Sequence, residues 1–477
     1  MKSAGPISDP AEKLTLAGAL RLNMLDMIGV GPFITLPLVL ALLPGYTAIW
    51  AWILAAVLAL CDGMVWAELG ASFPQAGGSY QYLKHIYGPQ GLGRLLAFLF
   101  AWQVLFSAPL SLASGGIGFA GYAGYLWPAL HQGGWQGRYF GIVWRFNAGT
   151  LVAMGVVLLA LFLLFRQIQG IEKLARWLWL GVMLALGMMI LAGLAHALGW
   201  HPLALAAAPP PPSSSAPVGR WAALATALLI ATYDYWGYYN ICFLAGELRQ
   251  PERTLPRAVL GSIAIVAGLY ILLNLGILSV IPASWFLTPA AHPGTHRAVA
   301  AVFMRLLIGG WGGRLAALLI MWTAFGSIFS LLLGYSRVPW AAARDGNFFR
   351  LFAPPGETRG FPARSLLVLA AAGMLGCLFS LTEVIAALVV VRLLLQFLLQ
   401  AVGLLWLRRR QPQIPRPFRM WLYPAPAWLA IAGFIYMLLA RPHFGRALGG
   451  AAIILGLGLA LYAWRQRLHR ASSPASL

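Results

Sequence analysis

Groups that can bind an amine lie in the middle of the segment Ile230–Glu247, which begins as a hydrophobic span. Asp234, Gly237 and Asn240 occur there among five aromatic residues. A carboxylate in hydrocarbon costs at least roughly 2.5–3.5 kcal/mol, and interrupted backbone at membrane depth is tolerated only where protein or water satisfies it. We therefore expect a helix that breaks near Asp234–Gly237 and lines a cavity. The alternative is a kinked helix that only packs in a bundle.

A second interruption lies in the hydrophobic span near the N-terminus. Gly29, Gly31 and Pro32 break this span, because proline removes a backbone amide and glycine allows the chain to unwind. Unwinding frees amides at the start of the outer half-helix, and their partial positive charge suits a carboxylate. Carbonyls freed in the other break, together with Asp234, suit an ammonium group. A carboxylate pocket opposite an amine pocket describes an amino acid.

Both breaks belong to a chain that is hydrophobic along most of its length. Of its 477 residues 60% are hydrophobic and 9% are charged, whereas soluble proteins carry about 25% charged residues. Repeated hydrophobic runs of about 20 residues predict an all-α membrane protein. About twelve spans are expected, at 15–43, 46–71, 91–127, 148–165, 173–198, 219–246, 258–281, 311–343, 364–381, 383–407, 424–440 and 446–464.

The two interrupted spans, the first and the sixth, occupy corresponding positions in two halves of the chain. Interrupted spans at matching positions indicate an inverted-repeat transporter whose binding site lies near the middle of the membrane. We expect one integral membrane domain, 1–477, with 15–200 as the first repeat, 219–407 as the second and 424–464 as two extra helices.

The net charge of +21 is explained by membrane topology rather than by a nucleic-acid partner. With the N-terminus placed inside, lysines and arginines on the inner side outnumber those on the outer side roughly threefold, as the positive-inside rule requires. This predicts a protein of the cytoplasmic (inner) membrane with both termini in the cytoplasm. The basic residues should also attract anionic lipid. No obligate protein partner is expected.

Metal, cofactor and enzyme chemistry are not expected. The three cysteines, Cys61, Cys242 and Cys377, all fall in hydrophobic spans and show neither disulfide nor metal-ligand spacing. The histidines give no metal spacing, and no nucleophile–base or phosphate-binding motif occurs where it could act.

Five motifs follow one another along the chain. They are GVGPF at 29–33, AEL–FPQAGGSYQY at 67–82, GELRQPERTLPRA at 246–258, SRVPWAAARDG at 336–346, and RPF with YP at 416–424. In type and order these motifs resemble those of the amino acid–polyamine–organocation permeases, and L-type amino acid transporters in particular. The resemblance implies a five-plus-five inverted repeat with two extra helices, broken helices 1 and 6, and amino acid substrates.

The resemblance also implies roles for particular residues. Backbone amides in the first break would hold the substrate carboxylate, carbonyls in the second would receive the amine, and Tyr233 would take the place of an aromatic outer gate. The substrate-binding positions are then Gly29, Val30, Gly31, Tyr233, Asp234, Tyr235, Trp236 and Gly237.

Three features depart from the family pattern. Pro32 stands where an aliphatic residue is usual, which removes one amide from the carboxylate pocket. The core of the fifth span, Trp177–Leu191, lacks the lysine that stands in for sodium in many proton-coupled members. Arg392 lies within the tenth span, on one helical face with Gln396 and Gln400.

The buried charges are candidates for gating or coupling. Glu68 and Glu247 either form a cytoplasmic gate with Arg337, Arg344 or loop arginines, or make static salt bridges at helix ends. Asp26 and Asp62 serve either as a proton relay or as buried hydrogen-bond partners.

Arg392 needs a partner at its depth in the membrane. It pairs either with Asp234, Asp62 or Asp26, as a fixed cation, or with backbone carbonyls. Ser327 and Ser330 on the eighth span either coordinate sodium or are small packing residues.

These features predict a secondary active transporter that moves amino acids by alternating access, with proton coupling or exchange. Asp234 in the amine pocket also suits a polyamine or cationic-amine porter. A receptor that binds an amino acid without moving it is a further alternative, and the lack of an appended signalling domain disfavours it.

Overall fold

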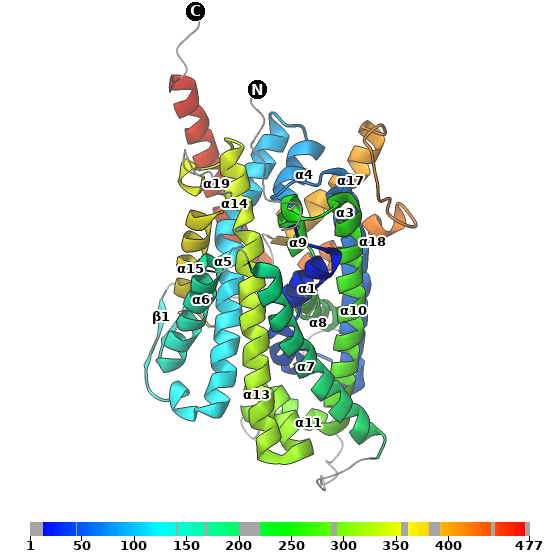
Figure 1. Ribbon diagram of the computed structural model, residues 1–477, viewed down its shortest axis with the longest axis vertical. Helices are drawn as coiled ribbons and strands as arrows, with labels where there is room; N and C mark the ends of the chain where they lie inside the picture. Colours follow the sequence, from blue (N-terminus) through cyan, green and yellow to red (C-terminus); the bar gives the residue numbers. More distant parts are fainter. Residues whose placement is uncertain are drawn as a thin grey trace, which may run out of the picture.

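The computed structural model describes residues 13–43, 45–139, 142–166, 170–199, 220–287, 293–353, 361–380, 392–439 and 444–472. Helices account for most of these residues, and they run roughly along the long axis of the molecule (Figure 1). Seven of the described helices are long and apolar enough to cross a membrane, or eight if the bent pair α1–α2 is one span. The protein is therefore an all-α, multi-pass membrane protein, and the number of twelve spans stays a prediction.

The helices of the first half follow the predicted spans closely. They are α1 (Leu16–Met27), α2 (Gly31–Leu40), α3 (Ile49–Ser72), α5 (Leu92–Leu126), α6 (Ala148–Arg166) and α7 (Ile171–Ala197). A short helix, α4 (Ser79–Ile86), follows the second span, and 3₁₀ turns occupy Gly45–Ala48 and Pro128–His131.

The second half begins with a helix that stops early and restarts. Its helices are α8 (Arg220–Tyr235), α9 (Asn240–Phe243), α10 (Pro251–Val280), α11 (Ala283–Leu287), α12 (Pro293–Arg297), α13 (Val299–Tyr335), α14 (Arg337–Arg344), α15 (Ala363–Gly376), the π-helix η6 (Leu393–Leu398), α17 (Leu399–Arg410), α18 (Ala425–Leu439) and α19 (Phe444–Ser472). Further 3₁₀ turns occupy Ala245–Glu247 and Arg350–Phe352.

Two details of the second half differ from the sequence prediction or lie outside the structure. Helix α13 begins earlier than the predicted span 311–343, and it contains non-helical backbone at Ile308 and Gly309. The start of the predicted span 383–407 lies outside the described residues, which resume at Arg392.

A short hairpin that was not predicted joins α5 to α6. Strand β1 (Trp135–Tyr139) pairs antiparallel with β2 (Ile142–Phe146), and Trp135 is opposite Phe146. The backbone of Arg145 also donates to the carbonyl of Leu378 beyond α15, at 2.7 Å. The hairpin thus attaches this connection to the second half of the chain.

The two interrupted helices have local causes. Helix α1 ends at Met27, and α2 restarts at Gly31 with Pro32 in its first turn, where a missing amide does little harm. The two axes differ by 42°. Helix α8 ends at Tyr235, and the turn 236–239 contains Gly237 at φ 122°, a conformation that favours glycine.

The main helix contacts join elements of the two halves. Helix α3 packs along α10, and α5 packs along α13. Helix α1 also contacts α10, and α8 contacts α3. In the predicted order of spans, the second is thus beside the seventh and the third beside the eighth, which is the arrangement that the predicted repeats would produce. The repeats themselves stay a prediction.

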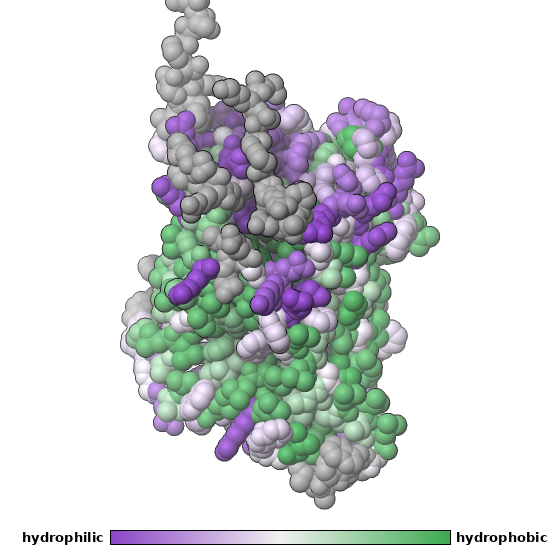
Figure 2. Space-filling view, in the orientation of Figure 1, coloured by the Kyte–Doolittle hydropathy of each residue, from purple (hydrophilic) through white to green (hydrophobic). Residues whose placement is uncertain are grey.

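The two ends of the helix bundle differ in character. We call the end with α4 and α14 the α4 end, and the end with α11 the α11 end (Figure 1). Figure 2 shows hydrophobic residues over the middle of this face and hydrophilic residues concentrated toward the α4 end. An apolar middle is what a surface in contact with lipid requires.

Candidate functional site

A cavity lies where the interrupted helices approach each other. The space within it that atoms leave empty, counted together with the part open to solvent, is about 510 Å³. The cavity is surrounded by the break between α1 and α2, by helix α5, by the end of α8 with its turn, and by helix α13. Arg392, which precedes η6, also lines it. The lining residues are Asp26, Met27, Gly29, Val30, Gly31, Ser111, Ser114, Gly115, Tyr233, Asp234, Trp236, Gly237, Tyr239, Ser327, Leu331, Tyr335 and Arg392.

The N-terminus of α2 presents free backbone amides at this cavity. Gly29 donates its amide to the carbonyl of Met27 at 3.1 Å. The amides of Val30 and Gly31 have no acceptor among the described residues, and no side chain caps the helix. Two of the three amides expected to bind a carboxylate are thus available, at the positive end of a helix.

The second break contributes four of its five expected residues to the cavity: Tyr233, Asp234, Trp236 and Gly237. Tyr233 shares a 2.6 Å hydrogen bond with Ser114 on α5. A β-carbon on Gly237 would lie 2.8 Å from backbone atoms of Asp26 and Met27. The two breaks therefore pack directly against each other, and the turn tolerates only glycine there.

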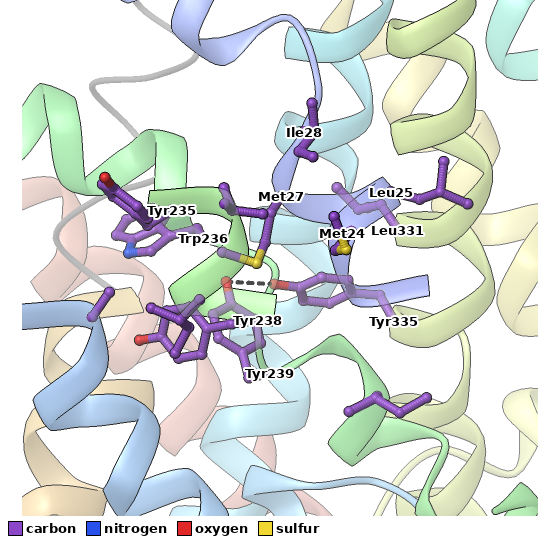
Figure 3. Close-up of a cluster of buried hydrophobic side chains, with 14 of the residues drawn as sticks. Met24, Leu25, Met27, Ile28, Tyr235, Trp236, Tyr238, Tyr239, Leu331 and Tyr335 are labelled. Atoms are coloured by element: carbon purple, nitrogen blue, oxygen red, sulfur yellow. Dashed lines mark hydrogen bonds between the residues drawn. The ribbon is translucent and has the colours of Figure 1, made fainter. Parts of the chain in front are cut away.

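Tyr235 is the exception, because it is not among the residues that line the cavity. Its hydroxyl donates to the carbonyl of Trp52 on α3 at 3.1 Å, and its ring packs on Tyr270 of α10. Figure 3 shows Tyr235 apart from Tyr239 and Tyr335, whose hydroxyls share a hydrogen bond. The structure thus gives Tyr235 a packing position, whereas the sequence predicted a binding one.

Asp234 connects three helices. Its Oδ2 accepts hydrogen bonds from Thr35 of α2 at 2.7 Å and from the indole of Trp52 at 3.0 Å. Its Oδ1 is buried and has no hydrogen-bond donor within the described part of the chain. One carboxylate oxygen therefore holds the helices together, and the other has no hydrogen-bond donor among the described residues.

Arg392 adds a cation to the lining of the cavity, beside the second break. Its guanidinium lies over the rings of Trp236 and Tyr335, 5.0 and 5.4 Å from their centroids. It donates to the carbonyl of Ser107 at 3.3 Å, to the Ser111 hydroxyl at 3.1 Å and to the Tyr239 hydroxyl at 3.4 Å. Of the two alternatives left by the sequence, a carboxylate partner or backbone carbonyls, the printed bonds of Arg392 go to one carbonyl and two hydroxyls.

The two unexpected aspartates occupy different environments. Asp26 lines the cavity and interacts electrostatically with Arg392. Asp62 lies away from the cavity on α3, where its Oδ2 accepts a 2.5 Å hydrogen bond from Tyr238 and its Oδ1 has no partner among the described residues. Of the three carboxylates considered for Arg392, Asp26 and Asp234 share its cavity and Asp62 does not.

The two serines considered as sodium ligands both hydrogen-bond to α1. Ser327 lines the cavity and donates to the carbonyl of Asp26 at 3.3 Å. Ser330 lies beyond the cavity, donates to the carbonyl of Leu22 at 2.7 Å and accepts from Asn240 at 3.1 Å. These bonds attach α13 to the first interrupted helix.

Charged pairs close the α4 end. Glu247 pairs with Arg337 at 2.6 Å, a contact that a gate and a static salt bridge would both make. Glu68, which is fully buried, pairs instead with Arg408 at the end of α17 and with Arg416 at 3.5 Å, and it accepts the amide of Met420 at 2.8 Å. Desolvation holds the pKa of Arg416 below its ordinary value, and the charge of Glu68 acts against that shift.

Arg344, the other candidate partner at the α4 end, lies over the ring of Trp340 at 4.8 Å. Nearby, Asp345 accepts hydrogen bonds from Tyr80 and Lys84 of α4, both at 2.5 Å. Burial, and then the bond to Asp345, raises the pKa of Tyr80 above its usual value. These contacts tie α4 to the end of α14.

Comparison with known proteins identifies the class. The profile described as "Amino acid permease" matches residues 14–448. The chain therefore belongs to the amino acid permease family, and it is a membrane transporter rather than an enzyme.

Individual relatives resemble the chain over most of its length. The serine/threonine exchanger SteT of Bacillus subtilis (strain 168) is 25% identical over 459 residues, which cover 94% of this chain and 96% of that protein. The Asc-type amino acid transporter 1 of Homo sapiens is 25% identical, with 89% and 77% covered. Solute carrier family 7 member 12 of Mus musculus is 26% identical, with 83% and 79% covered.

Proposed function

We propose that the protein is a secondary active transporter that carries amino acids by alternating access, with the substrate bound in the cavity between the two interrupted helices. One observation carries this proposal. Val30 and Gly31, whose amides have no acceptor in the described ranges, line the same cavity as Asp234, whose Oδ1 has no donor there. A donor pair beside a carboxylate oxygen offers a partner for each charge of a zwitterion.

The contacts around the cavity supply two gates. Toward the α4 end, the rings of Tyr239, Phe243 and Tyr335 pack together, and the Glu247–Arg337 pair lies beyond them. On the other side, the bond between Tyr233 and Ser114 joins α8 to α5. Alternating access requires that these two sets of contacts open in turn around one site.

The orientation in the membrane follows from the basic residues. Arginines 408, 409 and 410 end α17, and Arg416 and Arg419 follow them at the α4 end. The positive-inside rule therefore places the α4 end and both termini in the cytoplasm of the cell whose inner membrane holds the protein. Figure 2 shows hydrophilic surface concentrated toward the α4 end.

Transport is driven by protons or by exchange. Asp26 and Asp62 are buried carboxylates without a salt-bridge partner among the described residues, so each is able to take up a proton. Exchange is supported by the resemblance to SteT, which is named as a serine/threonine exchanger.

A second candidate is a porter of polyamines or other cationic amines. Asp26 and Asp234 both line the cavity, and two carboxylates suit a ligand with two ammonium groups. The amides at the start of α2 favour the amino acid, because a polyamine has no anionic group to place there.

Thermal shift and uptake measurements test the proposal. Purified protein is heated with alanine, serine, glutamate, lysine and putrescine, and the same compounds are followed into proteoliposomes. A ligand that binds the folded state raises the melting temperature. The proposal predicts stabilisation and uptake for at least one amino acid. If only putrescine raises the melting temperature and is taken up, the protein is a porter of amines. If a ligand binds but is neither taken up nor exchanged, the protein is a receptor.

A further inference from the structure

Arg392 is a buried cation whose hydrogen-bond partners among the described residues are all neutral, and Asp26 interacts with it only electrostatically. Its anchors are a backbone carbonyl and two hydroxyls, from Ser107, Ser111 and Tyr239. Its side chain is 2% exposed, and no carboxylate of the described residues lies within 4.0 Å of it. Such a charge is costly in an apolar interior unless an anion compensates it.

The guanidinium still has hydrogen atoms to donate. Of its five N–H groups, two on Nη2 and one on Nη1 are used. The Nε–H and the second hydrogen of Nη1 have no acceptor within the described ranges of the chain. Arg392 is therefore a positioned donor with unused capacity at the wall of a cavity.

The position of Arg392 within the cavity indicates what it would meet. The amides of Val30 and Gly31 and the carboxylate of Asp234 belong to the two breaks, where the charged ends of an amino acid would bind. Arg392 lies at the same cavity, beside Ser111 on α5 and over the ring of Trp236 in the second break. A substrate anchored at the breaks therefore lies in the same cavity as this guanidinium.

We infer that Arg392 recognises a carboxylate in the substrate side chain, so that the protein prefers acidic amino acids. This inference rests on the proposed function and names the substrate class of the same site. Each charge of an acidic amino acid then has a partner of opposite sign: the α2 amides for one carboxylate, Asp26 and Asp234 for the ammonium, and Arg392 for the second carboxylate.

The rings around Arg392 make this recognition rigid. Trp236 and Tyr335 cover the guanidinium plane, so that the cation does not have to be ordered when the substrate binds. A preorganised donor loses less entropy on binding than a mobile one. A neutral side chain of the same shape would leave the buried cation without its anion, and this difference produces selectivity.

The test compares acids with their amides, which differ little in shape. Binding of glutamate, glutamine, aspartate and asparagine to purified protein is measured by thermal shift and by competition in proteoliposomes. In the unaltered protein each acid should bind at least about 10-fold more tightly than its amide. Arg392→Gln should abolish this preference, which is measured as the ratio of the affinity for the acid to the affinity for its amide. The matched control is Arg314→Gln, which replaces an exposed arginine on α13. This variant should keep the preference for acids over amides.

Different failures have different meanings. If the unaltered protein binds glutamine as well as glutamate, the inference is wrong whether or not the Arg392 variant folds. Equal losses for acids and amides in Arg392→Gln would place the α-carboxylate on Arg392 and would also overturn it. Arg392→Lys, which keeps the charge, should retain part of the preference. If no amino acid binds or is transported, the proposed function itself has failed.

Discussion

A β-carbon added to Gly31 would lie 2.7 Å from the Oδ1 atom of Asp234, so these two residues touch across the gap between the interrupted helices. Gly31 begins α2, and Asp234 lies one residue before the end of α8. The free amide of one residue and the free carboxylate oxygen of the other are therefore close neighbours. An amino acid that binds here places its two charged groups next to each other, as they are in the free molecule.

Replacing Gly31 with valine should abolish substrate binding. The added side chain would displace Asp234 and fill the space at the start of α2, where the substrate carboxylate is proposed to bind. Gly155→Val on α6, where a β-carbon meets nothing within 4 Å, is the matched control. Binding is measured by thermal shift with saturating substrate. Normal affinity in a folded Gly31→Val variant would exclude this site.

Replacing Asp234 with asparagine should weaken diamines more than zwitterions. A few kcal/mol of Coulomb attraction act across a partly dry pocket, and a second ammonium group depends on them more heavily. The control is Thr35→Val, which removes a hydrogen bond to the same carboxylate but keeps its charge. Competition assays with putrescine, lysine and alanine measure how much affinity each ligand loses in the variant. Equal losses for all three ligands would make Asp234 a structural link between α2, α3 and α8.

The two acidic residues at the α4 end should respond differently to neutralisation. Glu68 is fully buried between Arg408 and Arg416, so Glu68→Gln leaves poorly solvated cations and should destabilise the fold by about 3–5 kcal/mol. The side chain of Glu247 is 33% exposed, so Glu247→Gln should cost little stability but should change the rate of transport. Melting temperature and uptake rate are measured for both variants. If Glu247→Gln leaves uptake unchanged, the pair with Arg337 is not a gate.

The sequence allowed much of the site to be predicted, because its unusual residues stand out against hydrophobic spans. Glycine and proline predicted where the backbone is interrupted, and Asp234 and Arg392 were conspicuous as charges at membrane depth. All of these residues except Pro32 line the cavity. Tyr235 was grouped with them because it shares their segment, but its side chain points to α3 and α10. The position of a residue along a turn does not determine where its side chain points.

Other parts of the site depend on long-range contacts that no local pattern reveals. Ser111 and Ser114 look like ordinary small residues of a membrane helix, and only the packing of α5 beside Arg392 and Tyr233 brings them to the cavity. Glu68 and Arg408 are 340 residues apart. The β1–β2 hairpin depends on pairing between two strands. The residues of these strands do not alternate clearly enough between polar and apolar to distinguish them from the helices on either side.

The last prediction concerns what drives transport. Asp26 lies in the cavity with Arg392, whereas Asp62 is bonded to Tyr238 outside it. A carboxylate that takes up a proton during the cycle makes transport depend on pH, and its replacement by asparagine removes that dependence. Because Asp26 lines the cavity proposed to bind substrate and Asp62 does not, we expect Asp26→Asn to have the larger effect. Uptake without sodium should rise when the outside of the vesicles is made acidic.

Uptake is measured in reconstituted vesicles with an imposed pH gradient and in vesicles with a sodium gradient. The comparison decides between proton-driven and sodium-driven transport. Strict dependence on sodium would contradict the prediction and would direct attention to Ser327, whose hydroxyl already contacts the carbonyl of Asp26 at 3.3 Å. Unchanged pH dependence in both asparagine variants would contradict it too. If labelled substrate inside exchanges for substrate outside with no gradient, while net uptake is absent, the protein is an exchanger. Asp26 would then act on the substrate alone, and Asp62 would be a buried hydrogen-bond partner of Tyr238.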